Sequence, residues 1–199
     1  MTRIALLRHF ETEWNRQGRI QGRSDPPLAR DVARNAAGRR LHGALAGMAW
    51  YASPLRRAVQ TAALLGLADL RRDARLMEMS WGDWEGARLA DLRRSPGRDM
   101  ARNEAKGLDF RPPGGESPRE LRERFAGWLA DIDGRDSAAV THKGVIRAAL
   151  SLALGWDLTG KAPVRSDWAC AHVFELDGRG GLTLARADHP VWEAERTGR

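Results

Sequence analysis

Residues 3–9 read Arg3-Ile-Ala-Leu-Leu-Arg-His9, a short apolar run that ends in an arginine and a histidine. This run predicts a buried strand over residues 3–7, because it is apolar without a break and too short for an ordinary helix. Residues 8–25 are polar and show no helical periodicity, which predicts an ordered loop. In α/β sheets, functional sites gather beyond the carboxyl ends of the strands. Arg8 and His9 are therefore expected to lie at a functional site.

A second strand end has the same character. Residues 138–141 predict a strand, Val140-Thr-His142-Lys-Gly144 follows its end, and residues 145–154 predict a helix. A neutral imidazole is a competent nucleophile toward phosphorus, and a neighbouring guanidinium can grip phosphate oxygens while disfavouring imidazole protonation. The Arg8-His9 pair is therefore consistent with His9 as a nucleophile and Arg8 as the group that binds the anion. Taken alone, an Arg-His dipeptide could also contain a histidine with a structural role.

The remaining elements alternate between helix and strand before a closing hairpin. The patterns predict helices at 29–45, 53–65 (Ser53 as cap and Pro54 in its first turn), 89–93 and 117–132, and strands at 48–52, 75–77, 169–176 and 182–185. The helix at 117–132 begins with the capping box Ser117-Pro-Arg-Glu120. This order predicts an α/β fold, a three-layer α/β/α sandwich with a mostly parallel central sheet, in one domain over residues 1–199.

Composition narrows the class of partner. The net charge of +7 over 199 residues would suit nucleic acid, but the arginines are interleaved with acids as on a solvated helix face. We therefore expect no nucleic-acid partner, and a positive field that attracts a small anionic substrate. The sequence shows no apolar run of membrane-spanning length and no signal peptide, which favours a cytoplasmic protein without a membrane partner. Cys170 is expected in a buried strand as a core thiol.

Several separated segments carry the chemistry-bearing residues. They are Arg8-His9-Phe-Glu-Thr12-Glu-Trp14-Asn15, Ser53-Pro-Leu-Arg-Arg57-Ala58, Leu76-Met-Glu78-Met-Ser-Trp-Gly82, Pro113-Gly-Gly-Glu116-Ser117 and Val140-Thr-His142-Lys-Gly144. In this order they resemble the histidine phosphatase superfamily, the relatives of phosphoglycerate mutase. The Pro113–Ser117 segment is typical of its phosphatase members. The resemblance covers most of the chain and implies the phosphoglycerate mutase-like fold and a phosphohistidine intermediate.

Residue by residue, the resemblance assigns roles around one phosphoryl group. It implies that His9 is the nucleophile, that Glu78 is the proton donor and later the base, and that three cations form the pocket: Arg8, Arg57 and His142. Further substrate contacts are expected from Thr12, Asn15, Gln21, Gly22 and Lys143. Motif spacing favours Arg57 over Arg56 for the pocket and excludes Glu85 as the acid. No metal or other cofactor is required, because the cations can stabilise the charge of the transition state.

The chain departs from the family pattern beside both histidines. Phe10 replaces the usual glycine, so either the loop keeps ordinary dihedral angles or the ring caps the pocket. Lys143 replaces a small residue and either strengthens anion binding or points to solvent. Trp81 and Trp84 flank the acidic motif, where they either line the substrate pocket or anchor the packing.

The segment around residues 87–115 separates the candidate reactions. Rich in Arg, Gly and Pro, it is expected to be a substrate-facing or mobile insertion. Leu89 stands where the mutase pattern has a lysine, which favours a phosphatase acting on a small phosphorylated metabolite over a mutase. A catalytically impaired phospho-ligand binding protein is the remaining alternative. The sequence leaves the substrate and the oligomeric state open.

Overall fold

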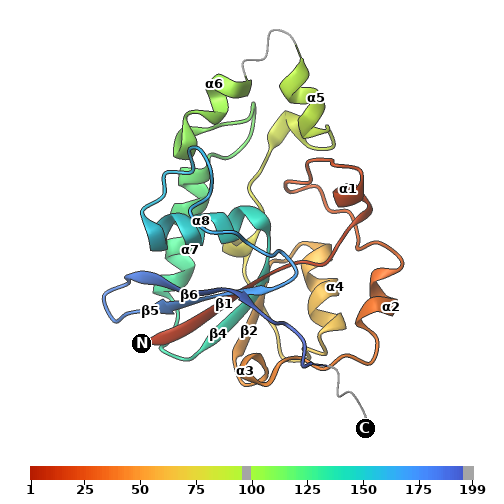
Figure 1. Cartoon of the computed structure of the whole chain (residues 1–199), viewed down its shortest axis with the longest axis vertical. Coiled ribbons are helices and arrows are strands. Elements are labelled where there is room, and N and C mark those ends of the chain that lie inside the picture. Colours follow the sequence, from red (N-terminus) through yellow and green to blue (C-terminus); the bar gives the residue numbers. More distant parts are fainter. Residues whose placement is uncertain (96–99, 195–199) are drawn as a thin grey trace.

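The computed structural model describes residues 1–95 and 100–194. Six strands form one mixed sheet in the order β3-β2-β4-β1-β5-β6, flanked by helices (Figure 1). The elements, with 3-10 helices written η, are β1 Thr2–Arg8, α1 Glu13–Arg16, α2 Val32–Ala36, α3 Gly43–Ala46, β2 Ala49–Ala52, α4 Arg56–Leu64, β3 Arg71–Arg72, η1 Ala74–Leu76, η2 Gly82–Trp84, α5 Leu89–Arg94, α6 Met100–Glu104, η3 Gly107–Asp109, α7 Pro118–Ala130, β4 Ser137–Thr141, α8 Lys143–Leu154, β5 Ala171–Leu176 and β6 Leu182–His189.

The pairing of β1 with β4 brings the two histidine segments together. These strands run parallel with Arg8 opposite Thr141, and the amide of His9 donates to the Thr141 carbonyl at 2.8 Å. His9 and His142 therefore leave the sheet side by side at its carboxyl edge. Strands β2 and β3 continue the parallel part, while β5 and β6 add an antiparallel edge. The predicted mostly parallel α/β sandwich is confirmed.

Two hydrophobic cores lie on opposite faces of the sheet. Along β1, Ile4 and Leu6 point into the core shared with α7 and α8. Ala5 and Leu7 point into the other core, which includes residues of α4. This alternation follows from the two-residue period of a strand. Figure 1 shows α7 and α8 on one side of the sheet and α4 on the other. Helices packed on both faces of the sheet thus hold the carboxyl ends of β1 and β4 in place.

The capping box predicted for α7 is confirmed. The Ser117 hydroxyl accepts from the Glu120 amide, and the Glu120 carboxylate accepts from the Ser117 amide at 2.8 Å. An apolar stripe then buries one side of the helix, at Leu121, Phe125, Trp128 and Leu129. Because this stripe packs against α8, it positions the helix that directly follows His142.

The helix predicted at 29–45 is wrong. The structure has two short helices there, α2 and α3, separated by an extended Ala37 and by Gly38 at φ +74°. A positive φ ends a helix readily at glycine, which lacks a Cβ. Residues 8–25 also hold one short helix, α1, which the loop prediction missed.

Two further predicted boundaries are wrong for local reasons. Helix α4 begins at Arg56, after Leu55, with no side-chain cap. The Ser53 hydroxyl accepts from the Leu55 amide at 3.3 Å and contacts Nε2 of His142. Residues 75–77, predicted as a strand, lie instead at η1 and its end. The Asp73 carboxylate accepts from the Arg75 amide and starts that turn. Strand β3 lies before it at Arg71–Arg72.

The closing hairpin is confirmed, but Cys170 is not part of it. Strand β5 begins at Ala171, and Cys170 is half-buried in the preceding turn. Its thiol donates to the Asp167 carboxylate at 3.6 Å. Burial, followed by the charge of Asp167, raises the pKa of this thiol. Cys170 is therefore not the core thiol that was predicted.

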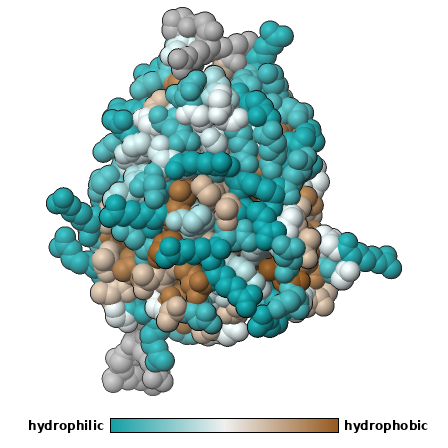
Figure 2. All heavy atoms as spheres, turned by 180° about the vertical axis from the view of Figure 1, so that it is seen from behind, coloured by the Kyte–Doolittle hydropathy of each residue, from teal (hydrophilic) through white to brown (hydrophobic). Residues whose placement is uncertain are grey.

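The surface is mostly polar. Hydrophilic residues cover most of the back of the molecule, and apolar residues show there as separate patches (Figure 2). Among the described residues, Met1 and Leu154 are the exposed large hydrophobic side chains. None of the described helices has the length and apolar character needed to cross a membrane.

The predicted insertion at 87–115 stands at one end of the molecule. It contains α5, α6 and η3, and its two short helices lie at the top of Figure 1. Leu92, Met100, Leu108 and Phe110 are buried, and Phe110 packs against Trp81 and Trp84, so apolar side chains join this segment to the main core. Residues 96–99 of the insertion and 195–199 of the predicted domain lie outside the described residues.

Candidate active site

His9 leaves the carboxyl end of β1 as a buried imidazole, 6% exposed. Its Nδ1 lies 2.6 Å from the Phe10 carbonyl oxygen. Since a carbonyl only accepts, Nδ1 carries the proton and donates it, which leaves a lone pair on Nε2. Burial and then the charges of Arg57 and Arg8 hold the pKa of His9 well below the usual histidine value. The ring is therefore neutral with a fixed tautomer, and its Nε2 lone pair is free to act as a nucleophile.

Two guanidinium groups stand beside His9, that of the half-buried Arg8 and that of the buried Arg57. Arg57, on the first turn of α4, is fully buried and donates to the carbonyls of Ser24 at 2.8 Å and Gly22 at 2.7 Å. The Nε atoms of Arg8 and Arg57 are buried and have no partner among the described residues. Burial lowers the pKa of both arginines, but a guanidinium keeps its proton in proteins. Both remain available to hold phosphate oxygens.

The second histidine is positioned from another strand. The rings of His142 and His9 lie 5.2 Å apart between centroids. The Nε2 of His142 lies 2.8 Å from the hydroxyl of Ser53, which follows β2. Its Nδ1 is buried without a partner among the described residues. Burial, then Arg57, holds the pKa of His142 well below the usual value. If Ser53 donates to Nε2, Nδ1 carries the proton and can donate to a phosphoryl oxygen.

Glu78 reaches this group from the turn after η1. One carboxylate oxygen accepts from the Met79 amide at 2.9 Å, and the other accepts from the Gly144 amide of α8 at 3.2 Å. A Cβ at Gly144 would collide with this carboxylate. The negative charge of Glu78 partly offsets the effect of burial on Arg8 and Arg57. The structure thus brings together all five predicted catalytic residues.

The loop from Thr12 to Gly22 supports the pocket in several ways. Thr12 is fully buried, and its hydroxyl lies 3.0 Å from Oδ1 of Asn15 and 3.1 Å from Oε1 of Gln21, to one of which it donates. The same hydroxyl accepts from the Asn15 backbone amide and caps α1. The side-chain nitrogens of Asn15 and Gln21, unlike the Asn15 backbone amide, have no hydrogen bond to other described residues, so they can donate to a ligand. The Gly22 carbonyl holds Arg57. Thr12 and Gly22 therefore build the pocket, whereas Asn15 and Gln21 retain free donors.

Comparison with known proteins agrees with this geometry. The family model of the histidine phosphatase superfamily (branch 1) matches residues 4–189. The chain belongs to this superfamily. It is 31% identical to a protein of Citrobacter koseri named probable phosphoglycerate mutase, over all of this chain and 93% of that protein. It is 28% identical to phosphoserine phosphatase 1 of Hydrogenobacter thermophilus, covering 92% and 91% of the two chains.

Other relatives extend the range of lengths and structures. The chain spans 44% of a bifunctional protein of Mycobacterium tuberculosis, to which it is 34% identical over 77% of its own length. A solved Thermus thermophilus protein matches with a TM-score of 0.72 at 33% identity, covering 94% of this chain and 99% of that one. A mycobacterial glucosyl-3-phosphoglycerate phosphatase matches with a TM-score of 0.72 at 25% identity, covering 95% and 100%.

The structure decides between the alternatives for Phe10, one of the two departures from the superfamily pattern. Phe10 has no positive φ, and its amide donates to Thr61. Its ring packs against Trp192, with centroids 5.9 Å apart. The loop therefore keeps ordinary dihedral angles, and the ring contributes to the core rather than capping the pocket.

Lys143, the other departure, lies between the pocket and the solvent. Its side chain is exposed, and its Nζ stands 5.1 Å from the centre of the Trp168 ring. Burial and then the charges of Arg8 and Arg147 lower the pKa of Lys143. The contact with Trp168 holds the ammonium beside α8 on the residue that follows His142.

Arg56 and Glu85, which motif spacing excluded from the pocket, and the two tryptophans beside the acidic motif lie in positions that fit structural roles. Arg56 is exposed. Glu85 accepts from the amides of Arg23, Ser24 and Trp81, which joins the loop at residues 23–24 to the turn at residues 81–85. Trp84 is buried and packs with Trp81 around Phe110. The two tryptophans are packing anchors, one of the two roles considered for them.

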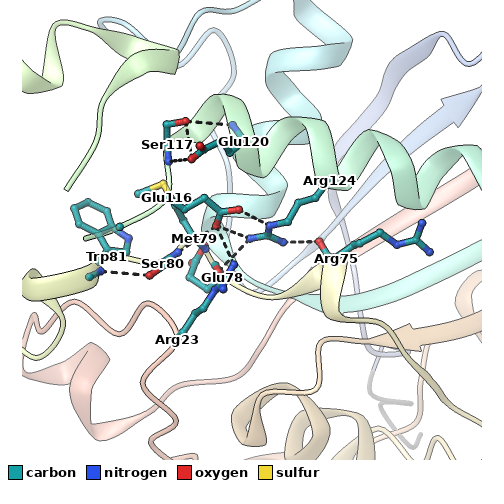
Figure 3. A network of polar contacts seen from close by, with 12 residues as sticks. Arg23, Arg75, Glu78, Met79, Ser80, Trp81, Glu116, Ser117, Glu120 and Arg124 are labelled. Atoms are coloured by element: carbon teal, nitrogen blue, oxygen red, sulfur yellow. Dashed lines mark hydrogen bonds and ion pairs between the residues drawn. The ribbon is translucent and has the colours of Figure 1, made fainter. Parts of the chain in front are cut away.

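A network that the sequence did not reveal supports Glu78 (Figure 3). Arg124 of α7 donates to the Glu78 carbonyl at 3.2 Å and also binds the Arg75 carbonyl. Glu116 holds the guanidinium of Arg124 at 2.6 Å and accepts from the Ser80 amide. Both side chains of this ion pair are largely buried. The Pro113–Ser117 motif had pointed to the Glu116 segment, but nothing in the sequence paired it with Arg124.

The described residues contain no group of three His, Cys, Asp or Glu side chains arranged to hold a metal ion. The polar groups around His9 are two guanidinium groups, the neutral imidazole of His142 and the carboxyl group of Glu78. Such a set favours binding of a phosphoryl group by hydrogen bonds and positive charge.

Proposed function

We propose that the chain is a metal-independent phosphatase that hydrolyses a small phosphomonoester through a phosphohistidine on His9. One observation carries the proposal: the buried His9 has its Nδ1 proton committed to the Phe10 carbonyl, with Arg8 and Arg57 beside it. A structural histidine would not need a free Nε2 facing two unpaired buried donors. This combination suits attack on a phosphoryl group, whose transfer depends mainly on positioning and on stabilised charge.

The reaction has two steps that reuse the same residues. In the first, Nε2 of His9 attacks phosphorus, the N–P bond forms, and the P–O bond to the leaving group breaks. Glu78 in its protonated form gives its proton to the leaving oxygen. Arg8, Arg57 and His142 donate to the equatorial oxygens, where the negative charge is spread. The product alcohol then leaves a phosphohistidine.

In the second step, water takes the place of the alcohol. The carboxylate of Glu78 accepts a proton from water as its oxygen attacks phosphorus. The N–P bond breaks, inorganic phosphate leaves, and His9 regains the lone pair on Nε2. Glu78 ends the cycle protonated, as it began. Its two backbone donors, Met79 and Gly144, hold the carboxylate in place throughout.

The names of the relatives support a small substrate. Phosphoserine, phosphoglycerate and glucosyl-3-phosphoglycerate are all phosphomonoesters that also carry a carboxylate. The relative named probable phosphoglycerate mutase makes mutase-type transfer the second candidate. Leu89, at the position where the mutase pattern has a lysine, favours hydrolysis.

Phosphate release from a panel of phosphorylated metabolites, measured with a chelator present, tests the proposal. Wild type is expected to release phosphate and His9→Ala to lose the activity. His42→Asn is the matched control, because it changes a histidine outside the site and keeps an N-cap acceptor for α3. Equal rates in wild type and His9→Ala would overturn the mechanism. Isomerisation of 3-phosphoglycerate, primed with its bisphosphate, that outpaces phosphate release would establish the mutase instead.

A further inference from the structure

Two cations on the first turns of α8 are not used by the proposed mechanism. Lys143 and Arg147 are four residues apart, so they lie on the same face of the helix. Within the described part of the chain, neither forms a hydrogen bond or an ion pair with a carboxylate. Other half-buried arginines do, as Arg75 does with Asp73 and Arg124 with Glu116.

Each of these cations rests instead on a tryptophan. The guanidinium carbon of Arg147 lies 4.8 Å from the centre of the Trp156 ring, and Lys143 is stacked similarly on Trp168. The Trp156 indole donates to the Thr159 carbonyl at 2.8 Å. Trp168 stacks on the buried His172, with ring centroids 5.6 Å apart. An aromatic face fixes a cation without using its N–H donors, so both cations keep donors for a ligand.

The pair adjoins the side of the phosphoryl pocket that holds Glu78. Lys143 directly follows His142, and Gly144 between the two cations donates to Glu78. Because Glu78 is the proposed proton donor to the leaving oxygen, a leaving group must extend past it. In the substrate-binding state of the proposed mechanism Glu78 is protonated and neutral, so Lys143 and Arg147 give this side of the pocket a positive charge that suits an anionic group. A guanidinium also matches the two oxygens of a carboxylate.

We propose that Lys143 and Arg147 form a second anion site that binds a carboxylate on the leaving group of the substrate. The substrate class is then the phosphomonoesters of small hydroxy acids and amino acids. This inference rests on the proposed function, because it takes His9 as the phosphoryl acceptor and Glu78 as the neighbour of the leaving oxygen. It assigns a recognition role to a lysine that replaces the small residue of the family pattern.

Matched substrates that differ only at the carboxylate test this site. Phosphoserine is compared with phosphoethanolamine, and 3-phosphoglycerate with glycerol 3-phosphate. Wild type is expected to show a kcat/KM at least about tenfold higher for the carboxylate member of one pair. Arg147→Gln and Lys143→Gln should each reduce this preference about tenfold, toward equal rates. Arg147→Lys, which keeps the charge, should retain part of it. Lys161→Gln, an exposed lysine beyond α8, should leave the preference unchanged.

Binding of the same pairs to His9→Ala, by calorimetry, separates this inference from the proposed function. A carboxylate preference that disappears in His9→Ala/Arg147→Gln supports the second site even if no substrate is turned over. Turnover that depends on His9, with a preference that neither Lys143→Gln nor Arg147→Gln alters, overturns the second site and leaves the phosphatase standing. Equal binding of both members of each pair also overturns it.

Discussion

At the scale of single residues, two backbone carbonyls fix the position of the Arg57 guanidinium. It spans the carbonyls of Ser24 and Gly22, and an ammonium group cannot reproduce that planar fork. Arg57→Lys is expected to lower kcat/KM on the order of 100-fold. Steady-state phosphate release measures this. Arg56→Lys, at the exposed neighbouring position, is the control, and a similar loss there would show that the effect is not specific to the pocket.

His172 is a residue whose burial carries a cost. Both of its ring nitrogens are buried without a partner in the described structure, and burial lowers its pKa. In the unfolded chain His172 takes up a proton near pH 6.5, whereas in the folded chain it stays neutral to a lower pH. The free energy of unfolding therefore falls as the pH drops below about 6.5. We expect His172→Phe to raise the melting temperature at pH 5.5 more than at pH 8. An equal shift at both values would contradict this.

At the scale of elements, α8 and the turn that carries Glu78 meet at a glycine. A Cβ at Gly144 would occupy the place of the Glu78 carboxylate, although alanine favours a helix by about 0.5–1 kcal/mol over glycine. Gly144→Ala should therefore lower kcat at least about tenfold without lowering the melting temperature. The matched control is Gly127→Ala in α7, where a Cβ meets only the tip of Arg75. Unchanged kcat in Gly144→Ala would remove Glu78 from the mechanism.

Helix α7 depends on its first turn. Ser117→Ala removes the hydroxyl that accepts from the Glu120 amide and should cost about 1 kcal/mol of unfolding free energy, measured by urea denaturation. Ser95→Ala should cost much less, because Ser95 follows α5 and its hydroxyl only donates to the Asp91 carbonyl in an exposed part of that helix. Because the Glu116–Arg124 pair lies at the same end of α7, Ser117→Ala should also lower kcat slightly. Equal stability losses in the two variants would refute the role of the cap.

At the scale of the whole molecule, a net charge of +7 surrounds a pocket built for an anion. Such a field raises the rate at which an anionic substrate reaches the site, and salt screens it. We expect kcat/KM for a phosphomonoester dianion to fall as the NaCl concentration rises from 20 to 300 mM, mainly through KM. Stopped-flow or steady-state assays with p-nitrophenyl phosphate can measure this trend. A salt-independent KM would exclude long-range attraction.

Much of the fold could be predicted because its signals are local. The apolar runs of β1 and β4 and the capping box of α7 each lie within a few residues of sequence. The helix predicted at 29–45 failed because its composition suits a helix while Gly38 interrupts it. The strand predicted at 75–77 failed because one side chain, Asp73, turns the backbone. Residue propensities for helix and strand do not include the effect of a single glycine or of one hydrogen bond from a side chain to the backbone.

The sequence by itself determined that two strands end in histidine and that an arginine adjoins the first of them. It also carried the motifs that place the chain in its superfamily. Only the tertiary structure decided that Ser53 holds His142 across 89 positions of sequence, that Arg124 supports Glu78, and that two tryptophans carry the cations of α8. The physical reason is distance along the chain. The spacing of residues in the sequence shows which side chains are neighbours on one helix or strand. The partners named above belong to separate elements and meet only when those elements pack together.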